Sequence, residues 1–331
     1  MGNEALNSVL RQEFHRAQSI LIVSHIRPDG DAIGSLLGLG QSLITAGKTV
    51  HMVLADGVPV SYRHLPGSNL IARKVKGSTY DLVVAVDSSD LLRTGGIQGN
   101  RSIDINIDHH VTNVNFGRIN YVCPDAQATA GILGENLEAW GLTVTETVAK
   151  ALLSGLVSDT IGFRTSNVTS NTLRLAAWLM DHGANLAELY NRAIVRRSFV
   201  AAQYWGQGLT RLQREGRMVW TSLTLEDRNT VAYQGNDDAD LVNVLSAIDE
   251  SHVSIIFVEQ KDHRVKVSWR AQPGWDVSAL ALSFGGGGHP AASGADIPGE
   301  LSEVEARVLE ATRQLIAKGS NGKTNSDKRP E

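Results

Sequence analysis

The chain has 331 residues and a formal net charge of −4, with 42% hydrophobic and 20% charged residues. Its length exceeds that of a usual single domain, so we expect two globular domains, and its negative charge argues against binding of long duplex nucleic acid. The single cysteine, Cys123, excludes an internal disulfide and a thiolate zinc cluster, and we expect it to be a small loop or core residue.

The apolar runs of the chain are too short for a membrane segment. None approaches the roughly 20 residues that a spanning helix needs, and residues 1–6 lack the basic and then apolar pattern of a signal peptide. We therefore expect a soluble, cytoplasmic protein without membrane contacts.

Short apolar runs alternate with helical patterns over the first half of the chain. The expected strands are 20–24, 49–54, 81–86 and 103–107, and the expected helices are 32–46, 126–140 and 145–157. Strands that alternate with helices predict a mostly parallel sheet with helices on both faces. In such sheets ligands gather at the carboxyl ends of the strands.

The second half begins with a helical stretch over 171–212, in which Arg196 and Arg197 are expected on a solvated helix face. A smaller α/β domain follows, with strands at 218–223, 252–259 and 264–270 and helices at 238–250 and 302–317. We divide the chain into a first domain (1–190), a helical connector (191–215), a second domain (216–318) and a disordered tail (319–331), which has no apolar residue to bury.

A loop directly after the first expected strand carries three metal-ligand residue types. His25, Asp29 and Asp31 are close enough to converge, and Gly30 lets the backbone turn between the two aspartates. Imidazole nitrogen and carboxylate oxygen without sulfur favour Mn²⁺ or Mg²⁺ over structural zinc. Taken alone, the pattern is equally typical of turn and cap chemistry.

Further acidic residues close apolar runs elsewhere. Asp87 follows residues 82–86, and a carboxylate at such a strand end has no packing reason to be there. The triplet Asp108-His109-His110 closes residues 102–107 in the same way. Asp159 follows a helical pattern, and by itself it is equally typical of a solvent-facing acid at a helix end. Together these segments predict a metal cluster assembled from strand ends and favour hydrolysis of a phosphate ester.

Five segments in this order resemble the DHH phosphoesterase family. They are 24–35 (SHIRPDGDAIGS), 86–90 (VDSSD), 108–110 (DHH), 158–160 (SDT) and 285–294 (GGGGHPAASG). Each motif is weak alone, but all five in this order are highly specific, and the resemblance covers about residues 5–317. The most similar branch is the soluble nanoRNase and 3′-phosphoadenosine 5′-phosphate (pAp) phosphatase group, which also includes enzymes that cleave cyclic di-AMP or pApA.

The resemblance implies a DHH metal-binding catalytic domain at 1–190 and a role for each ligand. One cation would be held by His25, Asp29 and Asp87, and the second by Asp31, Asp87, His109 and Asp159, with Asp87 as the bridge. The implied cofactors are two Mn²⁺, with Mg²⁺ or Co²⁺ as alternatives, which activate a water for in-line displacement. Replacement of Asp31 or His109 by alanine should then abolish turnover while leaving the fold intact.

Two further residues are implied to act in catalysis. Asp108 would orient an imidazole, as ligating histidines normally require, and His110 would face the substrate phosphate as a donor or general acid. Gly131 stands where many relatives carry a glutamate, a departure that affects the start of a helix and no ligand.

The resemblance also implies that residues 216–318 form a substrate-binding domain. Its substrate contacts would be Arg270, Gly286, Gly287, Gly288 and His289, because a glycine loop exposes backbone N–H groups to a phosphate. Without the resemblance, the glycine run is as typical of a flexible loop. Trp269 is expected in the core rather than stacked on a base, because adjacent strand residues face opposite sides. The active site is expected in the cleft between the two domains.

The resemblance implies Mn-dependent hydrolysis of very short single-stranded RNA or dinucleotides such as pApA, or 3′-phosphate removal from pAp, releasing nucleoside 5′-monophosphates. The enzymatic alternatives are a soluble cyclic di-AMP phosphodiesterase and an inorganic pyrophosphatase, and the glycine run with His289 argues against the latter. A nucleotide-binding sensor is the non-enzymatic alternative, and the presence of every expected ligand argues against it. A homodimer is compatible with the sequence.

Overall fold

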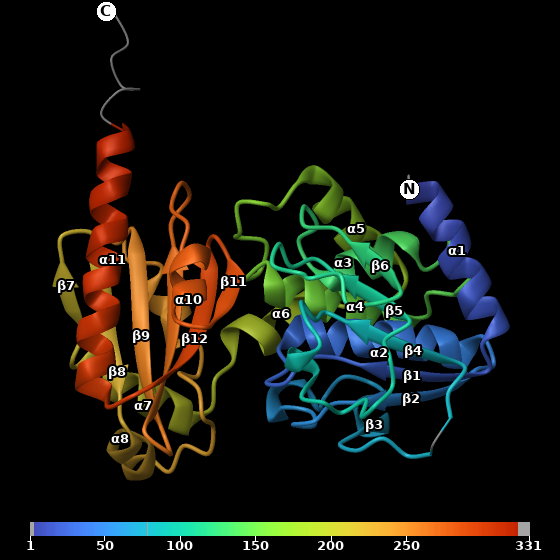
Figure 1. Cartoon of the computed structure of the whole chain (residues 1–331), viewed down its shortest axis with the longest axis horizontal. Coiled ribbons are helices and arrows are strands. Elements are labelled where there is room, and N and C mark those ends of the chain that lie inside the picture. Colours follow the sequence, from blue (N-terminus) through green and yellow to red (C-terminus); the bar gives the residue numbers. More distant parts are fainter. Residues whose placement is uncertain (1–2, 78, 324–331) are drawn as a thin grey trace, which may run out of the picture. The chain divides into compact units, whose positions relative to one another are not determined.

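The computed structural model describes residues 3–77 and 79–323, which fold into two compact units divided between Arg196 and Arg197 (Figure 1). The boundary falls inside the expected connector, 191–215. The backbone of the last helix continues to Lys323, so residues 319–323 are helical rather than part of a disordered tail. The remainder of that expected tail, 324–331, lies outside the described residues. Within the described residues, no helix is long and apolar enough to cross a bilayer.

The first unit contains a six-stranded sheet in which every pairing is parallel. Its strands are β1 (Ser19–Val23), β2 (Thr49–Val53), β3 (Ile71–Ala72), β4 (Leu82–Val86), β5 (Ile105–Asp108) and β6 (Ile119–Val122). The four expected strands are confirmed, whereas the short edge strands β3 and β6 were not predicted. The order β3-β2-β1-β4-β5-β6 changes direction between β1 and β4, which is the position where such sheets bind ligands.

The helices of the first unit pack mainly on one face of this sheet. They are α1 (Asn3–Arg16), α2 (Gly30–Thr45), α3 (Thr129–Asn136), α4 (Glu146–Asp159), α5 (Ser170–Asp181) and α6 (Leu186–Tyr190), with the short turns η1 (Val60–Tyr62), η2 (Ser68–Leu70) and η3 (Leu92–Thr94) and the π-helical η4 (Asn191–Val195). Their buried side chains join Ile22 and Val84 in the larger core cluster. On the opposite face, Leu21 and Val83 pack against side chains of connecting segments, such as Tyr80.

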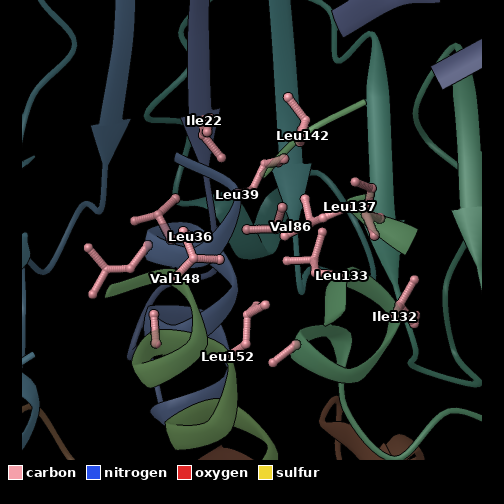
Figure 2. Packing of buried hydrophobic residues seen from close by; sticks show 14 of the residues in the cluster. Ile22, Leu36, Leu39, Val86, Ile132, Leu133, Leu137, Leu142, Val148 and Leu152 are labelled. Carbon is pink, nitrogen blue, oxygen red and sulfur yellow. The ribbon is translucent and has the colours of Figure 1, made fainter. Parts of the chain in front are cut away.

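Helices α2 and α4 approach each other closely because glycines lie where they cross. A Cβ atom at Gly34 would lie 2.5 Å from the carbonyl oxygen of Ala151 and 2.9 Å from Cα of Gly155. Beside this crossing, Leu36 of α2 and Val148 and Leu152 of α4 lie together in the apolar layer (Figure 2). The crossing fixes the position of the start of α2 relative to the end of α4.

The second unit contains a mixed sheet of order β11-β12-β10-β9-β8-β7, in which only β8 and β9 are parallel. Its elements are α7 (Phe199–Leu209), β7 (Gln213–Glu215), β8 (Met218–Leu223), α8 (Leu225–Thr230), α9 (Leu241–Leu245), β9 (Val253–Gln260), β10 (Arg264–Ala271), α10 (Ser278–Ser283), β11 (Gly287–His289), β12 (Ala292–Pro298) and α11 (Leu301–Lys323). The expected strands β8, β9 and β10 and the final helix are confirmed. Strands β7, β11 and β12 and helices α8 and α10 were not predicted.

Three expectations for this part of the chain are wrong. The helix expected over 238–250 is reduced to α9, which begins after Asp240 in the left-handed conformation, with φ of 66°. Arg197 lies between η4 and α7 rather than on a helix, where it pairs with Asp240 at 2.7 Å. Helix α7, placed in a connector by the sequence, contributes Ala201 and Tyr204 to the core of the second unit.

The second sheet buries both of its faces. One face carries Val267 and Trp269 and packs against α10 and α11, and the other carries Ile256 and Val258 and packs against α7 and α9. Trp269 is fully buried, so its expected place in the core is confirmed.

The glycine contact between α2 and α4 predicts a change in stability. Gly34→Ala should destabilise the protein by about 1–3 kcal/mol, because the added methyl group meets backbone atoms that cannot move aside. Gly131→Ala is the matched control: Gly131 lies in α3, a Cβ there would meet nothing nearer than 3.7 Å, and the substitution should be neutral or stabilise by up to about 1 kcal/mol. The urea denaturation midpoints check both, and equal midpoints would contradict the proposed close contact.

Candidate metal centre

Three adjacent strands bring separate segments of the predicted site to one edge of the first sheet. His25 follows β1, Asp87 follows β4 directly, and Asp108 ends β5. Because β1, β4 and β5 are parallel neighbours, the residues at their carboxyl ends meet at this edge. Asp87 adopts φ of 54°, a conformation that is uncommon outside glycine and that often marks functional sites.

Helix α2 supplies two aspartates from its first turn. Asp29 is its N-cap, and Oδ1 of Asp29 accepts hydrogen bonds of 3.0 Å from the backbone N–H groups of Asp31 and Ala32. Gly30 is required between the aspartates, because a Cβ there would lie 2.4 Å from Cβ of Ser158 at the end of α4. This close approach brings Asp31 near Asp159, the last residue of α4.

The first group of donors consists of His25, Asp29 and Asp87. Nε2 of His25 lies 3.8 Å from Oδ1 of Asp29 and 3.4 Å from Oδ2 of Asp87. The Nδ1 atom lies 2.8 Å from the carbonyl oxygen of Ile26 and donates to it, so in the neutral ring the lone pair of Nε2 faces the carboxylates. Nε2 is buried without a hydrogen-bond partner. A nitrogen lone pair held against two carboxylates fits a divalent cation between them.

The second group consists of Asp31, Asp87, His109 and Asp159. Nε2 of His109 lies 3.8 Å from Oδ2 of Asp31, 3.7 Å from Oδ1 of Asp87 and 3.6 Å from Oδ2 of Asp159. These distances are too long for hydrogen bonds, but they suit ligands that each lie about 2.1 Å from one shared cation. The structure therefore brings all six predicted ligands together, and Asp87 directs one oxygen toward each group.

The clustered negative charges raise the pKa values of both an aspartate and a histidine of the centre. Burial, together with the charges of Asp87 and Asp159, raises the pKa of the Asp31 carboxyl well above its ordinary value. Burial alone would lower the pKa of His25, but Asp29 and Asp87 raise it to about 10. Negative charge is therefore in excess at the centre, which favours bound cations.

Asp31 has a second role that the sequence did not reveal. Its Oδ2 accepts a hydrogen bond of 2.6 Å from the N–H of Thr129, and its Oδ1 one of 2.9 Å from Ala130. These residues begin α3, whose own N-cap, Ala128, has no capping side chain. Replacement of Asp31 by alanine would leave two buried N–H groups without partners, so the expectation that this variant keeps the fold intact needs revision.

Thr129 is a further residue that sequence reasoning missed. Its Oγ1 donates a hydrogen bond of 3.1 Å to Oδ1 of Asp87 and so orients the carboxylate shared by the two groups. Gly131, where many relatives carry a glutamate, lies at the start of α3. The first N–H groups of this helix are capped by Asp31, which is distant in sequence, rather than by a neighbouring side chain.

The histidines of the triplet have different partners. Asp108 is fully buried, and its Oδ1 lies 2.8 Å from Nδ1 of His110, so the imidazole it orients is that of His110. His109 instead has its Nδ1 3.3 Å from the carbonyl oxygen of Ala126. Asn113, which the sequence did not single out, donates a hydrogen bond of 2.6 Å to Oδ2 of Asp108. The resemblance had suggested that Asp108 orients the proposed ligand His109. The structure shows instead that Asp108 orients His110.

The predicted substrate-binding residues lie in the second unit, at one end of its sheet. Arg270 of β10 and His289 of β11 both pair with Ala292 of β12, so their side chains share a face of the sheet. On this face Nε of Arg270 donates a hydrogen bond of 3.1 Å to Oδ1 of Asn243.

The glycine run is not a simple loop. Gly287 and Gly288 belong to the edge strand β11, and a Cβ at Gly286 would lie 2.1 Å from the carbonyl oxygen of Gly294. Gly288 has φ of 138°, whereas a Cβ at Gly285 or Gly287 would meet no atom within 4 Å. The absence of side chains at Gly286 and Gly288 therefore allows β11 to lie close to β12, a contact that the sequence did not predict.

Comparisons with known proteins agree with this geometry. Residues 19–156 match the DHH family, N-terminal domain, and residues 231–318 match the DHHA1 domain. A bifunctional oligoribonuclease and PAP phosphatase from Thermus thermophilus is 36% identical over 308 residues, which cover 90% of each chain. This chain belongs to the DHH phosphoesterase family. As a member, it is a hydrolytic enzyme of the phosphodiesterase or phosphatase type.

Two further relatives extend over most of the DHH phosphoesterase chain. A bifunctional oligoribonuclease and PAP phosphatase from Bacillus subtilis is 28% identical over 290 residues, covering 84% of this chain and 89% of the relative. The crystal structure of an exopolyphosphatase-related protein from Bacteroides fragilis superposes with a TM-score of 0.84 at 25% identity, covering 95% of this chain and 96% of the other. The two-unit fold is therefore shared along nearly the whole chain.

The metal centre predicts a stabilisation by divalent cations. Mn²⁺ at about 100 times its Kd should stabilise the folded protein by about 2.7 kcal/mol and raise Tm by several degrees, because the cation binds only the folded site. EDTA should reverse the shift. Differential scanning calorimetry of the same preparation with each addition measures both effects.

Asp87→Asn tests whether the shift comes from this centre. It should abolish most of the Mn²⁺ response, and asparagine tolerates the left-handed backbone of Asp87. The matched control is Asp181→Asn at the exposed end of α5, which should respond like the wild type. An equal Mn²⁺ shift in Asp87→Asn and the wild type would contradict the assignment.

Proposed function

We propose that this enzyme hydrolyses phosphoester bonds in very short oligoribonucleotides and dinucleotides such as pApA, and removes the 3′-phosphate of pAp, with release of nucleoside 5′-monophosphates. The observation that carries the proposal is the position of Asp87, whose two carboxylate oxygens face two separate groups of donors. This arrangement suits two cations that share one carboxylate.

The proposed cation ligands are His25, Asp29 and Asp87 for one position and Asp31, Asp87, His109 and Asp159 for the other. Oxygen and imidazole donors without sulfur favour Mn²⁺, with Mg²⁺ or Co²⁺ as alternatives. When bound, the two cations would supply a nucleophilic water at neutral pH and neutralise charge on the phosphate. The protein orients its ligands through Thr129, which contacts Asp87, and through the carbonyl of Ala126, which contacts His109.

We propose that His110, which is not a cation ligand, contacts the reacting phosphate. Its Nδ1 lies 3.8 Å from Oδ1 of Asp87, so the ring borders the shared carboxylate. Asp108 holds the ring by its hydrogen bond to Nδ1, which leaves Nε2 directed away from that carboxylate. We assign catalysis to His110 and its support to Asp108.

The substrate class is proposed from the relatives and from the second unit. Relatives that match nearly the full chain are named oligoribonucleases and PAP phosphatases, whose substrates are short or mononucleotide. The cation Arg270 and the imidazole of His289 share one face, and the edge strand at Gly287 is open to solvent contact. We propose that Arg270, Gly286, Gly287, Gly288 and His289 bind the substrate. The net charge of −4 also disfavours long nucleic acid.

Activity assays on a panel of substrates test this function. With Mn²⁺, the wild type should release phosphate from pAp and AMP from pApA and a 5-mer RNA, and His109→Ala should lose this turnover because one cation loses a ligand. His15→Ala is the matched control, since His15 is exposed at the end of α1, beside the amino ends of the strands. Chromatography of the products measures each rate.

Pyrophosphate and cyclic di-AMP complete the panel and separate the alternatives. Preference for either one over pAp, pApA and RNA would assign the enzyme to the corresponding alternative activity. Binding of pApA without turnover in Mn²⁺, Mg²⁺ or Co²⁺ would contradict the enzymatic proposal and favour a nucleotide sensor.

The roles of His110 and Asp108 predict graded losses. His110→Ala should lower kcat by roughly 10²–10⁴-fold, as expected for a group that acts on the substrate directly. Asp108→Asn should cost roughly 10–100-fold, because it only orients that ring. Both variants should keep the Mn²⁺ shift in Tm, and a larger loss in Asp108→Asn than in His110→Ala would contradict this order.

A further inference from the structure

Arg93 places a guanidinium group beside the candidate metal centre. It lies on η3, in the segment that follows Asp87, and its side chain is half-buried. Its Nη1 lies 3.4 Å from Nε2 of His110. The side chain therefore reaches the same catalytic ring that Asp108 holds from the other nitrogen.

The backbone of Arg93 is held on both sides. Its N–H donates a hydrogen bond of 2.9 Å to Oδ1 of Asp90, and its carbonyl oxygen accepts one of 2.7 Å from the N–H of Ile26, next to His25. Thr94 stabilises the turn by donating to the carbonyl of Leu91 at 2.7 Å. None of these bonds involves the guanidinium, so a change of the Arg93 side chain leaves the turn intact.

The hydrogen-bond directions around His110 define what each group offers to a substrate. A guanidinium can only donate, so Nε2 of His110 accepts from Arg93 and the ring proton resides on Nδ1, facing Asp108. The fixed positive charge and the available N–H donors at this position belong to Arg93.

The guanidinium is not neutralised by the protein. Among residues 3–77 and 79–323, no carboxylate lies within ion-pair distance of Arg93, although acidic side chains crowd the neighbouring centre. Arginine presents five N–H donors in a planar fork that matches the oxygens of a phosphate. Only one of these donors is used by His110.

We propose that Arg93 binds a non-bridging oxygen of the scissile phosphate and stabilises the charge that develops on it during hydrolysis. This inference rests on the proposed function, because it assigns Arg93 to the same reaction. It also adds to the proposed role of His110, which accepts a hydrogen bond from the guanidinium before the substrate arrives.

Side-chain variants of Arg93 test this proposal with pAp and pApA in Mn²⁺. Arg93→Ala should lower kcat by roughly 10²–10³-fold, as does removal of one donor to a developing oxyanion. Arg93→Lys should lose less, because it keeps the charge without the fork. Guanidinium ion at sub-denaturing concentration should restore part of the activity of Arg93→Ala and none of that of His110→Ala, which a merely structural role of Arg93 would not produce.

Equilibrium binding gives a readout that does not depend on turnover. Isothermal titration of the Mn²⁺-loaded protein with inorganic phosphate and with AMP should show weaker binding for Arg93→Ala, while the Mn²⁺ shift in Tm stays as in the wild type. The matched control is Arg118→Ala. Arg118 directly precedes β6, at the amino end of that strand, whereas the candidate metal centre lies at the carboxyl ends. It pairs with Glu13 at 3.0 Å and with Asp104 at 3.4 Å. Its removal should change neither rate nor phosphate affinity.

The outcomes separate this inference from the proposed function. Wild-type kcat and phosphate affinity in Arg93→Ala would overturn the role of Arg93 while leaving the function intact. Loss of the Mn²⁺ response together with failure of guanidinium rescue would also overturn it, because the residue would then support the metal centre. If the wild type hydrolyses none of the substrates, the proposed function fails, and the phosphate titration still decides whether Arg93 binds the anion.

Discussion

Three buried carboxylates, those of Asp31, Asp87 and Asp108, create the electrostatic constraint on which the site depends. Burial of a charge is costly unless donors or cations compensate it. The protein uses a different solution for each one. Backbone N–H groups at the start of α3 serve Asp31, Thr129 and two imidazoles face Asp87, and His110 with Asn113 serves Asp108. The remaining negative charge lies between His25 and His109, where divalent cations fit best.

The scaffold satisfies this constraint through topology and close packing. Parallel strands β1, β4 and β5 end side by side, so residues distant in sequence share one sheet edge. Glycines then bring α2 and α4 together, and a Cβ at Gly155 would lie 3.0 Å from Oδ1 of Asp31. Packing and chemistry are therefore coupled, because a larger residue at this crossing would displace a proposed ligand as well as the core.

Adjacent histidines take opposite roles because each ring is held by a different group. The carbonyl of Ala126 contacts Nδ1 of His109 and leaves its Nε2 directed at three carboxylates. Asp108 contacts Nδ1 of His110 and leaves its Nε2 directed at Arg93. Nε2 therefore faces carboxylates in His109 and the guanidinium of Arg93 in His110. This difference separates the proposed binding of metal ions by His109 from the proposed phosphate contact near His110.

The sequence by itself determined the parallel sheet and the positions of β1, β4 and β5, because apolar runs are local signals. The six proposed ligands were implied by the resemblance of its motifs to the DHH family. Tertiary structure decided which groups complete the site. The bond between Asp31 and Thr129 spans 98 residues, and those of Asp108, Asn113 and Arg93 depend on loops meeting at the sheet edge. It also decided that the glycine run forms edge strand β11, because that conformation depends on contact with β12, which no local pattern encodes.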